Sequence, residues 1–273
     1  MTPLTAPAGA PAATDFTRQM TPQPVPVARE LTMDDLSAAL SDAAADFRAA
    51  PFYGLAFGGF YTLIGAGALA TCIAFGWTHL IVPVISGFLL FGPFAALGLY
   101  QVSRMRAAGQ PLTPARVFLA FREHGGGQIA LFGLVLLCLT ILWMQIAAFL
   151  YALFFGLSPM PVGTLLASVF TTWNGAEFAL LGTLVGAVCA LTVFATSVFG
   201  MPMLLDARVD VATALIASVA TVRANARVMF AWAVMVALLI GCALVFGLVG
   251  LVVVLPLVGH GTWHLYARAF HTV

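Results

Sequence analysis

Long apolar stretches without any charged side chain dominate this chain. Residues 126–157 and 228–259 contain no Asp, Glu, Lys or Arg. A helix of about 20 apolar residues is long enough to span the hydrocarbon core of a bilayer. The pattern predicts six membrane-spanning helices, at about residues 52–74, 80–103, 127–156, 176–204, 227–246 and 249–268.

The last two predicted spans need a turn between them. Residues 227–268 are too long for a single crossing, because an α-helix rises 1.5 Å per residue. Gly247 and Gly250 are the best candidates for the turn, since glycine interrupts helices readily.

A shorter helical pattern precedes each pair of predicted spans. In residues 32–48 the apolar stripe consists of Met33, Leu36, Leu40, Ala44 and Phe47. Thr32 with Asp35 three residues later has the spacing of a capping box. Residues 114–124 and 211–226 follow the capping residues Thr113 and Asp210. The predicted fold is an all-α membrane protein of three hairpins, each preceded by a short cytoplasmic amphipathic helix.

The two ends of the predicted domain differ in composition. Residues 1–30 are rich in Ala, Pro and Thr and lack the apolar region of a signal peptide, so we expect a disordered cytoplasmic tail. Residues 31–270 then form one transmembrane domain. In the long outer loop 157–175, residues 163–172 are a candidate interfacial helix.

Charge is scarce and unevenly placed. Only 8% of residues are charged and 62% are hydrophobic, whereas a soluble domain averages about 25% charged residues. All basic residues are Arg, and every one falls on the N-terminal side of the predicted topology. The positive-inside rule therefore predicts cytoplasmic N- and C-termini in a bacterial inner (plasma) membrane. The net charge of +1 gives no reason to expect nucleic acid as a partner, and the lipid bilayer is the expected one.

Few side chains in the predicted spans could perform chemistry. Glu177 is expected at a helix start near water, and Gln145 near the middle of the third span is expected to bond a neighbouring helix. The four cysteines lack metal-site spacing, and no Walker loop, nucleophile elbow or dinucleotide fingerprint occurs. The sequence therefore predicts no cofactor and no enzymatic activity.

Two histidines form the best candidate for a metal site. His260 and His264 are four residues apart, which places them on one face of the last span. A third ligand is not evident, although His124, His271 and Asp206 lie on the same side of the membrane. The alternative is that these histidines hydrogen-bond helix ends.

Charged residues at the membrane edge have two interpretations. Asp206, Arg208 and Asp210 follow the fourth span and could form a structural ion cluster with one another or with neighbouring arginines. A second interpretation is an anion or lipid-headgroup site formed by Arg104, Arg208 and Arg268. The pattern of Gly182 and Gly186 in the fourth span favours close helix packing inside the bundle.

Several motifs in fixed order resemble a known family. They are Leu31-Thr-Met-Asp-Asp-Leu, the second span from Gly87 to Tyr100 followed by Ser103-Arg104, Pro202-Met-Leu-Leu-Asp-Ala-Arg-Val-Asp, and Pro256-Leu-Val-Gly-His-Gly-Thr-Trp-His-Leu-Tyr. Together they resemble the domain-of-unknown-function family 2189 of bacterial predicted integral membrane proteins. The resemblance runs from about residue 30 to 268, departs from the family at Gln101-Val-Ser-Arg-Met, and implies a topology without an activity.

Three functions fit this picture. The first is a non-enzymatic accessory or assembly component of a larger membrane complex, because the spans are poor in polar residues. The second is a transporter or channel for a small or lipidic solute, for which Thr140, Gln145, Thr192 and Thr196 are modest candidates. The third is a metal-associated membrane protein that uses His260 and His264.

Overall fold

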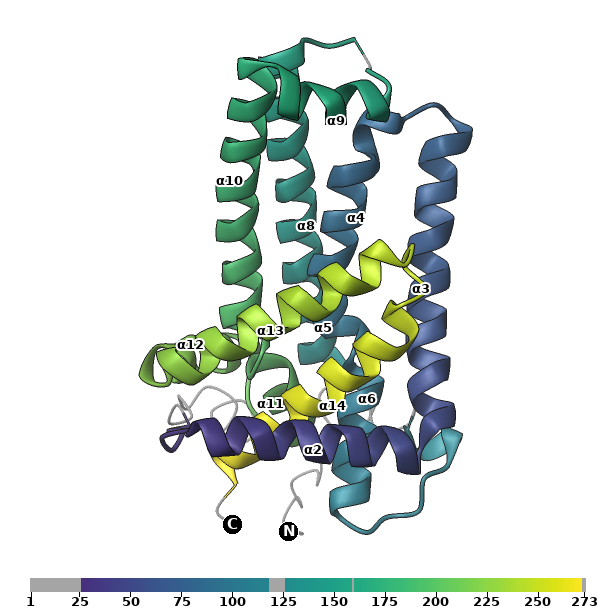
Figure 1. Cartoon of the computed structure of the whole chain (residues 1–273). Coiled ribbons are helices and arrows are strands. Elements are labelled where there is room, and N and C mark those ends of the chain that lie inside the picture. The colour runs from purple at the N-terminus through teal and green to yellow at the C-terminus, as the bar shows by residue number, and fades with distance from the viewer. Residues whose placement is uncertain (1–25, 118–125, 159, 272–273) are drawn as a thin grey trace, which may run out of the picture.

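The described chain is helical and contains no strand in the ranges 26–117, 126–158 and 160–271, which are the residues that this computed structural model describes. Long helices run between two ends of the molecule (Figure 1). We call the end that carries helix α2 (Met33–Ala49) the basal end, and the end that carries helix α9 (Val162–Thr171) the distal end. The expected tail lies mostly outside the described residues.

Helix α2 begins where the sequence predicts it. The Thr32 side chain accepts a hydrogen bond from the backbone N–H of Asp35, and the Asp35 side chain accepts one from the backbone N–H of Thr32. This capping box satisfies two N–H groups that the first helical turn leaves unpaired. The buried face differs from the predicted stripe, because it consists of Leu36, Ala39, Ala43 and Asp46, while Met33 is exposed.

The first hairpin consists of one straight helix and one interrupted helix. Helix α3 (Pro51–Ala74) leads to the distal end, where the 3-10 turn η1 (Thr78–Leu80) follows. The chain returns through α4 (Ile81–Leu90), α5 (Gly92–Ala95) and α6 (Leu97–Ala107), so the predicted span 80–103 is three segments. Pro93, at the start of α5, has no N–H to continue the ladder of α4, which accounts for one interruption.

The second hairpin is the longest. Helix α8 (Gly126–Phe155) rises to the distal end, α9 lies across that end as predicted for residues 163–172, and α10 (Trp173–Ser197) with α11 (Gly200–Asp206) returns (Figure 1). The predicted helix 114–124 lies mostly outside the described residues, and its first residues are helical from Pro114 to Val117.

The last hairpin is inclined to the long helices and extends only part of the way toward the distal end. Helices α12 (Val211–Ala224), α13 (Ala226–Val245) and α14 (Leu251–Phe270) follow the predicted boundaries, and the turn lies at Gly247 and Leu248, each with φ of 68°. In Figure 1 this turn stands near mid-height of α3, well short of α9. The contacts agree, since Val252, the second residue of α14, lies against Gly58 in the first half of α3.

The prediction of six crossing helices is therefore not confirmed. Four helical stretches are long and apolar enough to cross a membrane: Pro51–Ala74, Gly126–Phe155, Trp173–Asp206 and Ala226–Val245. The second predicted span is present as interrupted segments, and α14 packs beside α2 and α3 as the return of a hairpin that turns at mid-height.

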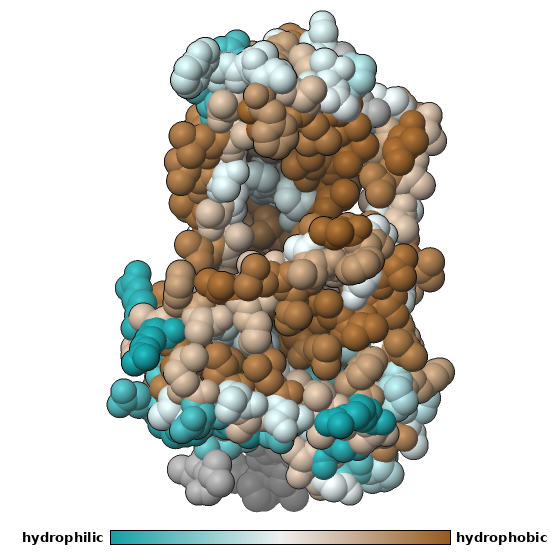
Figure 2. All heavy atoms as spheres, in the orientation of Figure 1, coloured by the Kyte–Doolittle hydropathy of each residue, from teal (hydrophilic) through white to brown (hydrophobic). Residues whose placement is uncertain are grey.

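The core lies in the basal half, and a broad apolar surface lies outside it. Trp232, Trp263, Phe132 and Phe199 are almost fully buried where α14, α13, α8 and α11 meet. Figure 2 shows hydrophobic residues over most of the visible face and hydrophilic residues gathered mainly toward the basal end. Such an exposed apolar area would be unfavourable in water, so a bilayer is its natural solvent.

Candidate functional site

Polar and charged side chains converge at the basal end, around helix α14. The residues of this basal network are Asp42, Asp46, Ser103, Arg104, Arg106, Asp206, His260, His264, Tyr266 and Arg268. They come from α2, α6, α11 and α14, which are distant in sequence. The network is the largest concentration of titratable groups in the described part of the chain, so it is the first place to look for chemistry.

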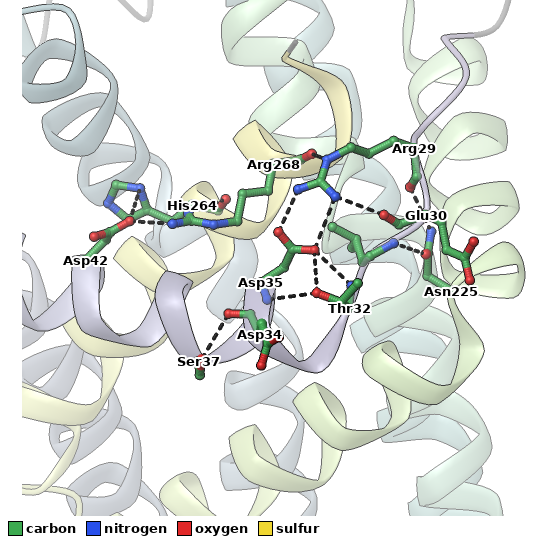
Figure 3. A network of polar contacts seen from close by, with 11 residues as sticks. Arg29, Glu30, Thr32, Asp34, Asp35, Ser37, Asp42, Asn225, His264 and Arg268 are labelled. Atoms are coloured by element: carbon green, nitrogen blue, oxygen red, sulfur yellow. Dashed lines mark hydrogen bonds and ion pairs between the residues drawn. The ribbon is translucent and has the colours of Figure 1, made fainter. Parts of the chain in front are cut away.

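The segment before α2 fastens this helix to α14. The Arg29 guanidinium lies 2.6 Å from a carboxylate oxygen of Asp35 and donates to the carbonyl oxygen of Arg268 at 2.6 Å (Figure 3). The backbone N–H of Leu31 donates to the side-chain oxygen of Asn225 at 2.6 Å. Residues 29–31 are thus bonded to both α14 and the α12–α13 corner.

About two turns further along α2 than Asp35, Asp42 binds α14. The Arg268 guanidinium lies 2.6 Å from the Asp42 carboxylate, and the His264 ring Nδ1 lies 4.0 Å from the same oxygen (Figure 3). Asp42 and Asp46 are four residues apart, so they face the same side of α2.

Asp46 is the centre of the network. Its side chain is 8% exposed and accepts hydrogen bonds from the Ser103 hydroxyl at 2.6 Å and from Arg106 Nε at 2.7 Å. His264 Nε2 lies 2.8 Å from the carboxylate. A buried carboxylate is tolerated only when it is paired and hydrogen-bonded, and Asp46 satisfies both conditions through two other helices.

These contacts favour the ionised form of the carboxylates on α2. Burial raises the pKa of Asp46, but the hydrogen bonds from His264, Ser103 and Arg106 outweigh it and bring this pKa below its ordinary value. The hydrogen bond from Arg29, with those from Thr32, lowers the pKa of Asp35 to about 2. Both acids are therefore negatively charged at neutral pH.

Ser103, His260 and Asp46 contain the residue types of a hydrolytic triad in a different order. The Ser103 hydroxyl lies between His260 Nδ1, at 2.7 Å, and the Asp46 carboxylate, at 2.6 Å. In a Ser-His-Asp triad the histidine stands between the other two and removes the serine proton. Here the serine proton is directed to the carboxylate, and Ser103 and His260 are 0% exposed, so no substrate reaches them. The arrangement suits structural hydrogen bonding.

A second carboxylate connects α11 with α6 and α14. Asp206 lies 2.9 Å from Arg104 Nε, accepts a hydrogen bond from the Tyr266 hydroxyl at 3.1 Å, and lies 2.7 Å from His271 Nε2. Together with Asp46, this residue connects the three hairpins at the basal end.

The geometry does not support the metal site expected at His260 and His264. The first ring bonds Ser103 and the second bonds Asp46. Of the proposed third ligands, His271 pairs with Asp206, and His124 lies outside the described residues. Among residues that the structure describes, no three His, Cys, Asp or Glu side chains are grouped as a metal site requires.

The arginines expected to form an anion site, Arg104, Arg208 and Arg268, do not share one partner. Arg104 pairs with Asp206 and Arg268 with Asp42, so two of the three charges are neutralised on different carboxylates. Asp206, Arg208 and Asp210 likewise make no ion pairs with one another in the described part of the chain. Asp210 caps α12 through the backbone N–H of Thr213 at 2.9 Å, and exposed Arg208 makes no ion pair within the described ranges.

The two polar residues singled out in the predicted spans lie on different helices. Gln145 lies on the exposed face of α8, opposite the face that packs on the bundle. Glu177 is exposed in the second turn of α10, and Thr172 caps that helix instead, accepting from the backbone N–H of Gly175 at 3.0 Å. Gly186 packs on Trp143 as internal packing requires, whereas nothing lies within 4 Å of a Cβ placed on Gly182.

Sequence reasoning missed Asp42, Asp46, Ser103 and Arg106. Both of these acids lie outside the predicted apolar stripe of α2, where an acid is normally exposed to solvent. A usable signal was present in the run Asp35, Ala39, Asp42 and Asp46, which places acids and one small residue on a single helix face. Such a face lets another helix approach closely and bring basic partners.

Comparison with known proteins supports the membrane assignment. Residues 81–206 match a family model described as "Predicted integral membrane protein (DUF2189)". The resemblance seen in the sequence is thereby confirmed from α4 to α11. No curated protein and no solved structure matches the chain.

Proposed function

Starting from an integral membrane protein that contains a DUF2189 region, we propose that the chain is a non-enzymatic component of a larger complex in a bacterial inner membrane. In this proposal the long helices of the second hairpin contact a partner subunit within the bilayer. The basal network holds the chain's own hairpins together and takes no part in a reaction.

The observation that carries this proposal is the exposed amide of Gln145. This residue lies about 7 Å from the midpoint of α8 at 1.5 Å per residue, among exposed Ile141, Leu142 and Phe149. Exposing an amide to hydrocarbon without a hydrogen-bond partner costs on the order of several kcal/mol, which is the free energy of transferring an amide from water to an apolar environment. A helix from another subunit that bonds this amide removes the cost, and interhelical bonds of this kind contribute about 0.6–2 kcal/mol.

The neighbouring helix supports the same proposal. In the most apolar part of Trp173–Asp206 only 6% of the residues are fully buried, so one side of α10 is available to lipid or to a partner. Gly182 on this helix has open space around it, which would let a partner helix approach closely. These features add to the Gln145 argument but do not replace it.

The placement of the arginines supports an orientation in which the basal end faces the cytoplasm. The described arginines belong to the basal network or to the loops and helix ends beside it. Under the positive-inside rule, the basal end then faces the cytoplasm, and both ends of the described chain lie on that side.

The test is affinity purification of the full chain from its native membrane in mild detergent, followed by a native gel, mass spectrometry and metal analysis. The proposal expects a stoichiometric membrane partner. The Gln145→Leu variant should lose that partner on the order of tenfold, because the amide bond is removed while the apolar surface is kept.

Thr192→Val is the matched control. Thr192 is also exposed in an apolar span, but its hydroxyl already donates to the carbonyl of Val188 at 2.8 Å. Its removal should leave the partner bound. Recovery of the chain alone, or equal loss of the partner in both variants, would contradict the proposal.

A second candidate function rests on shape. Figure 2 shows the visible face hollowed in the distal half, beyond the inclined α13, where the last hairpin does not cover the bundle. A transporter for a small or lipidic solute would use such an opening to the bilayer. Reconstituted chain that moves a labelled lipid between leaflets, with no partner present, would favour this candidate over the first.

A further inference from the structure

Two arginines at the corner between α12 and α13 lack the acidic partners of the basal network. Arg223 lies in the last turn of α12 and Arg227 at the start of α13, and both are exposed. Arg29, Arg104, Arg106 and Arg268 each pair with a carboxylate, whereas no ion pair to Arg223 or Arg227 exists in the described ranges. Two positive charges are therefore available at one edge of the molecule.

The corner is fixed in place. Asn225 stands between the two arginines, is 5% exposed, and accepts a hydrogen bond from the backbone N–H of Leu31 at 2.6 Å. Its side-chain amide donates to the carbonyl of Thr221 at 3.1 Å. Glu30 is adjacent in the chain to residues that Asn225 binds, yet it makes no ion pair with either arginine. The two charges are therefore carried by a rigid backbone.

An apolar hollow adjoins the first of these arginines. It has a volume of about 330 Å³ and is lined by Leu215, Ile216, Val219, Ala220 and Arg223. Ile216 is 58% exposed, and Phe230, one turn after Arg227, is 70% exposed. Hydrophilic side chains stand over this part of the molecule at the border of the apolar surface (Figure 2). An apolar hollow and unpaired positive charge thus meet at the border of the apolar surface.

We propose that this corner binds an anionic phospholipid, with Arg223 and Arg227 at the phosphate and the hollow on α12 against an acyl chain. A basic cluster at the membrane edge attracts anionic lipids, and each additional Lys or Arg strengthens the attraction. Arginine also donates to a phosphate from two nitrogens at once, which adds geometric selectivity. The inference goes beyond the proposed function and does not depend on a partner subunit.

Other unpaired arginines do not offer the same combination. Arg48 donates to the carbonyl of Ala44 on its own helix, and Arg116 lies in the short helical stretch from Pro114 to Val117 that follows α6. Neither lines the hollow on α12. They serve as controls because they have the same charge and comparable exposure.

The experiment titrates purified full-length chain with phosphatidylglycerol or phosphatidylcholine of identical acyl chains and counts bound lipid by native mass spectrometry. The chain should bind phosphatidylglycerol at least about tenfold more tightly. This preference should fall on the order of tenfold in the Arg223→Gln, Arg227→Gln double variant. The Arg48→Gln, Arg116→Gln double variant should keep it, although its net charge changes equally.

The acyl chain is tested separately with soluble glycerophosphoglycerol, which carries the headgroup alone. We expect it to compete weakly with phosphatidylglycerol, because it has no acyl chain to occupy the apolar hollow. Full competition would overturn the lipid assignment in favour of a plain phosphate site. The absence of any preference in the unmodified chain, or equal loss in both double variants, would overturn the site itself. The single variants Arg223→Gln and Arg227→Gln repeat the test should the double variant not fold.

Discussion

At the scale of single residues, Asp46 explains how the basal end is held together. Its buried carboxylate accepts hydrogen bonds from Ser103 and Arg106 on α6 and contacts His264 on α14. One side chain of α2 therefore connects two other helices. Substitution of Asp46 is therefore expected to affect stability strongly, because it leaves buried charges and hydrogen-bond donors without partners.

Replacement of Asp46 by Asn should destabilise the chain strongly. The amide keeps the shape of the carboxylate but leaves the positive charge of Arg106 unpaired and half-buried. We expect a loss of about 3 kcal/mol, seen as a decrease of about 6–10 °C in Tm in detergent. Asp34→Asn is the control, since Asp34 is exposed on the same helix and makes no ion pair in the described ranges. Equal decreases in the two variants would refute the central role of Asp46.

Acid should loosen α2 before it unfolds the membrane helices. The pKa of Asp35 is lowered to about 2 and that of Asp46 is also lowered, so their folded pKa values lie below the unfolded value of about 3.9. The stability they contribute is present above about pH 4 and is lost as pH falls toward 2.

Limited proteolysis between pH 6 and pH 3 measures this loosening. Cleavage near residue 30 should increase as pH falls below about 4 in the unmodified chain. The Asp35→Asn, Asp46→Asn variant should be cleaved already at pH 6, with a flat pH profile. A sloping profile in that variant would assign the pH dependence to other groups.

At the scale of elements, close approach between helices decides how the last hairpin docks. A Cβ on Gly58 would lie 2.5 Å from the carbonyl oxygen of Val252, so α3 and α14 touch through their backbones there. Backbone cannot move aside as a flexible side chain can. Glycine at this position therefore sets the distance between α3 and α14.

Gly58→Ala should push α14 away from α3. We expect a loss of about 1–3 kcal/mol from overpacking, measured as a lower Tm. Gly59→Ala is the matched control, because nothing lies within 4 Å of a Cβ at Gly59. That control should be neutral or gain up to about 1 kcal/mol, since alanine favours helix. A neutral Gly58→Ala variant would disprove the tight contact.

At the scale of the whole molecule, the inclination of the last hairpin decides the topology. The turn between α13 and α14 stands near mid-height of α3, while α9 lies at the distal end (Figure 1). The hairpin thus starts at the basal end and returns to it without reaching the level of α9. Both termini of the described chain lie at one end in either case, so the positive-inside argument for the basal end is unaffected.

Cysteine labelling distinguishes a full crossing from a partial one. In a chain without its native cysteines, an impermeant maleimide applied to intact cells should label Thr164→Cys on α9. Arg48→Cys should react only after the inner membrane is opened. Phe246→Cys, at the turn and 73% exposed, should react in neither case, because it lies within hydrocarbon. Its labelling in intact cells would restore six crossings.

Local patterns in the sequence were enough to predict most helices and two of their caps. Apolar runs and capping residues are local, so the boundaries of α2, α3, α8, α12 and α13 and the caps at Thr32 and Asp210 were predictable. The segregation of arginines to one end was predictable for the same reason. Residues 81–206, which include the motif from Gly87 to Arg104, match a family of predicted integral membrane proteins.

Packing between helices distant in sequence determines which polar groups meet and how far the last hairpin extends along the bundle. Asp46, Ser103 and His260 are separated by more than 50 and 150 residues, and no local pattern brings them together. The histidines predicted to share a metal bond Ser103 and Asp46 instead, because α14 packs against both α2 and α6. Hydropathy reports whether a helix tolerates hydrocarbon, whereas its tilt depends on the helices it packs against.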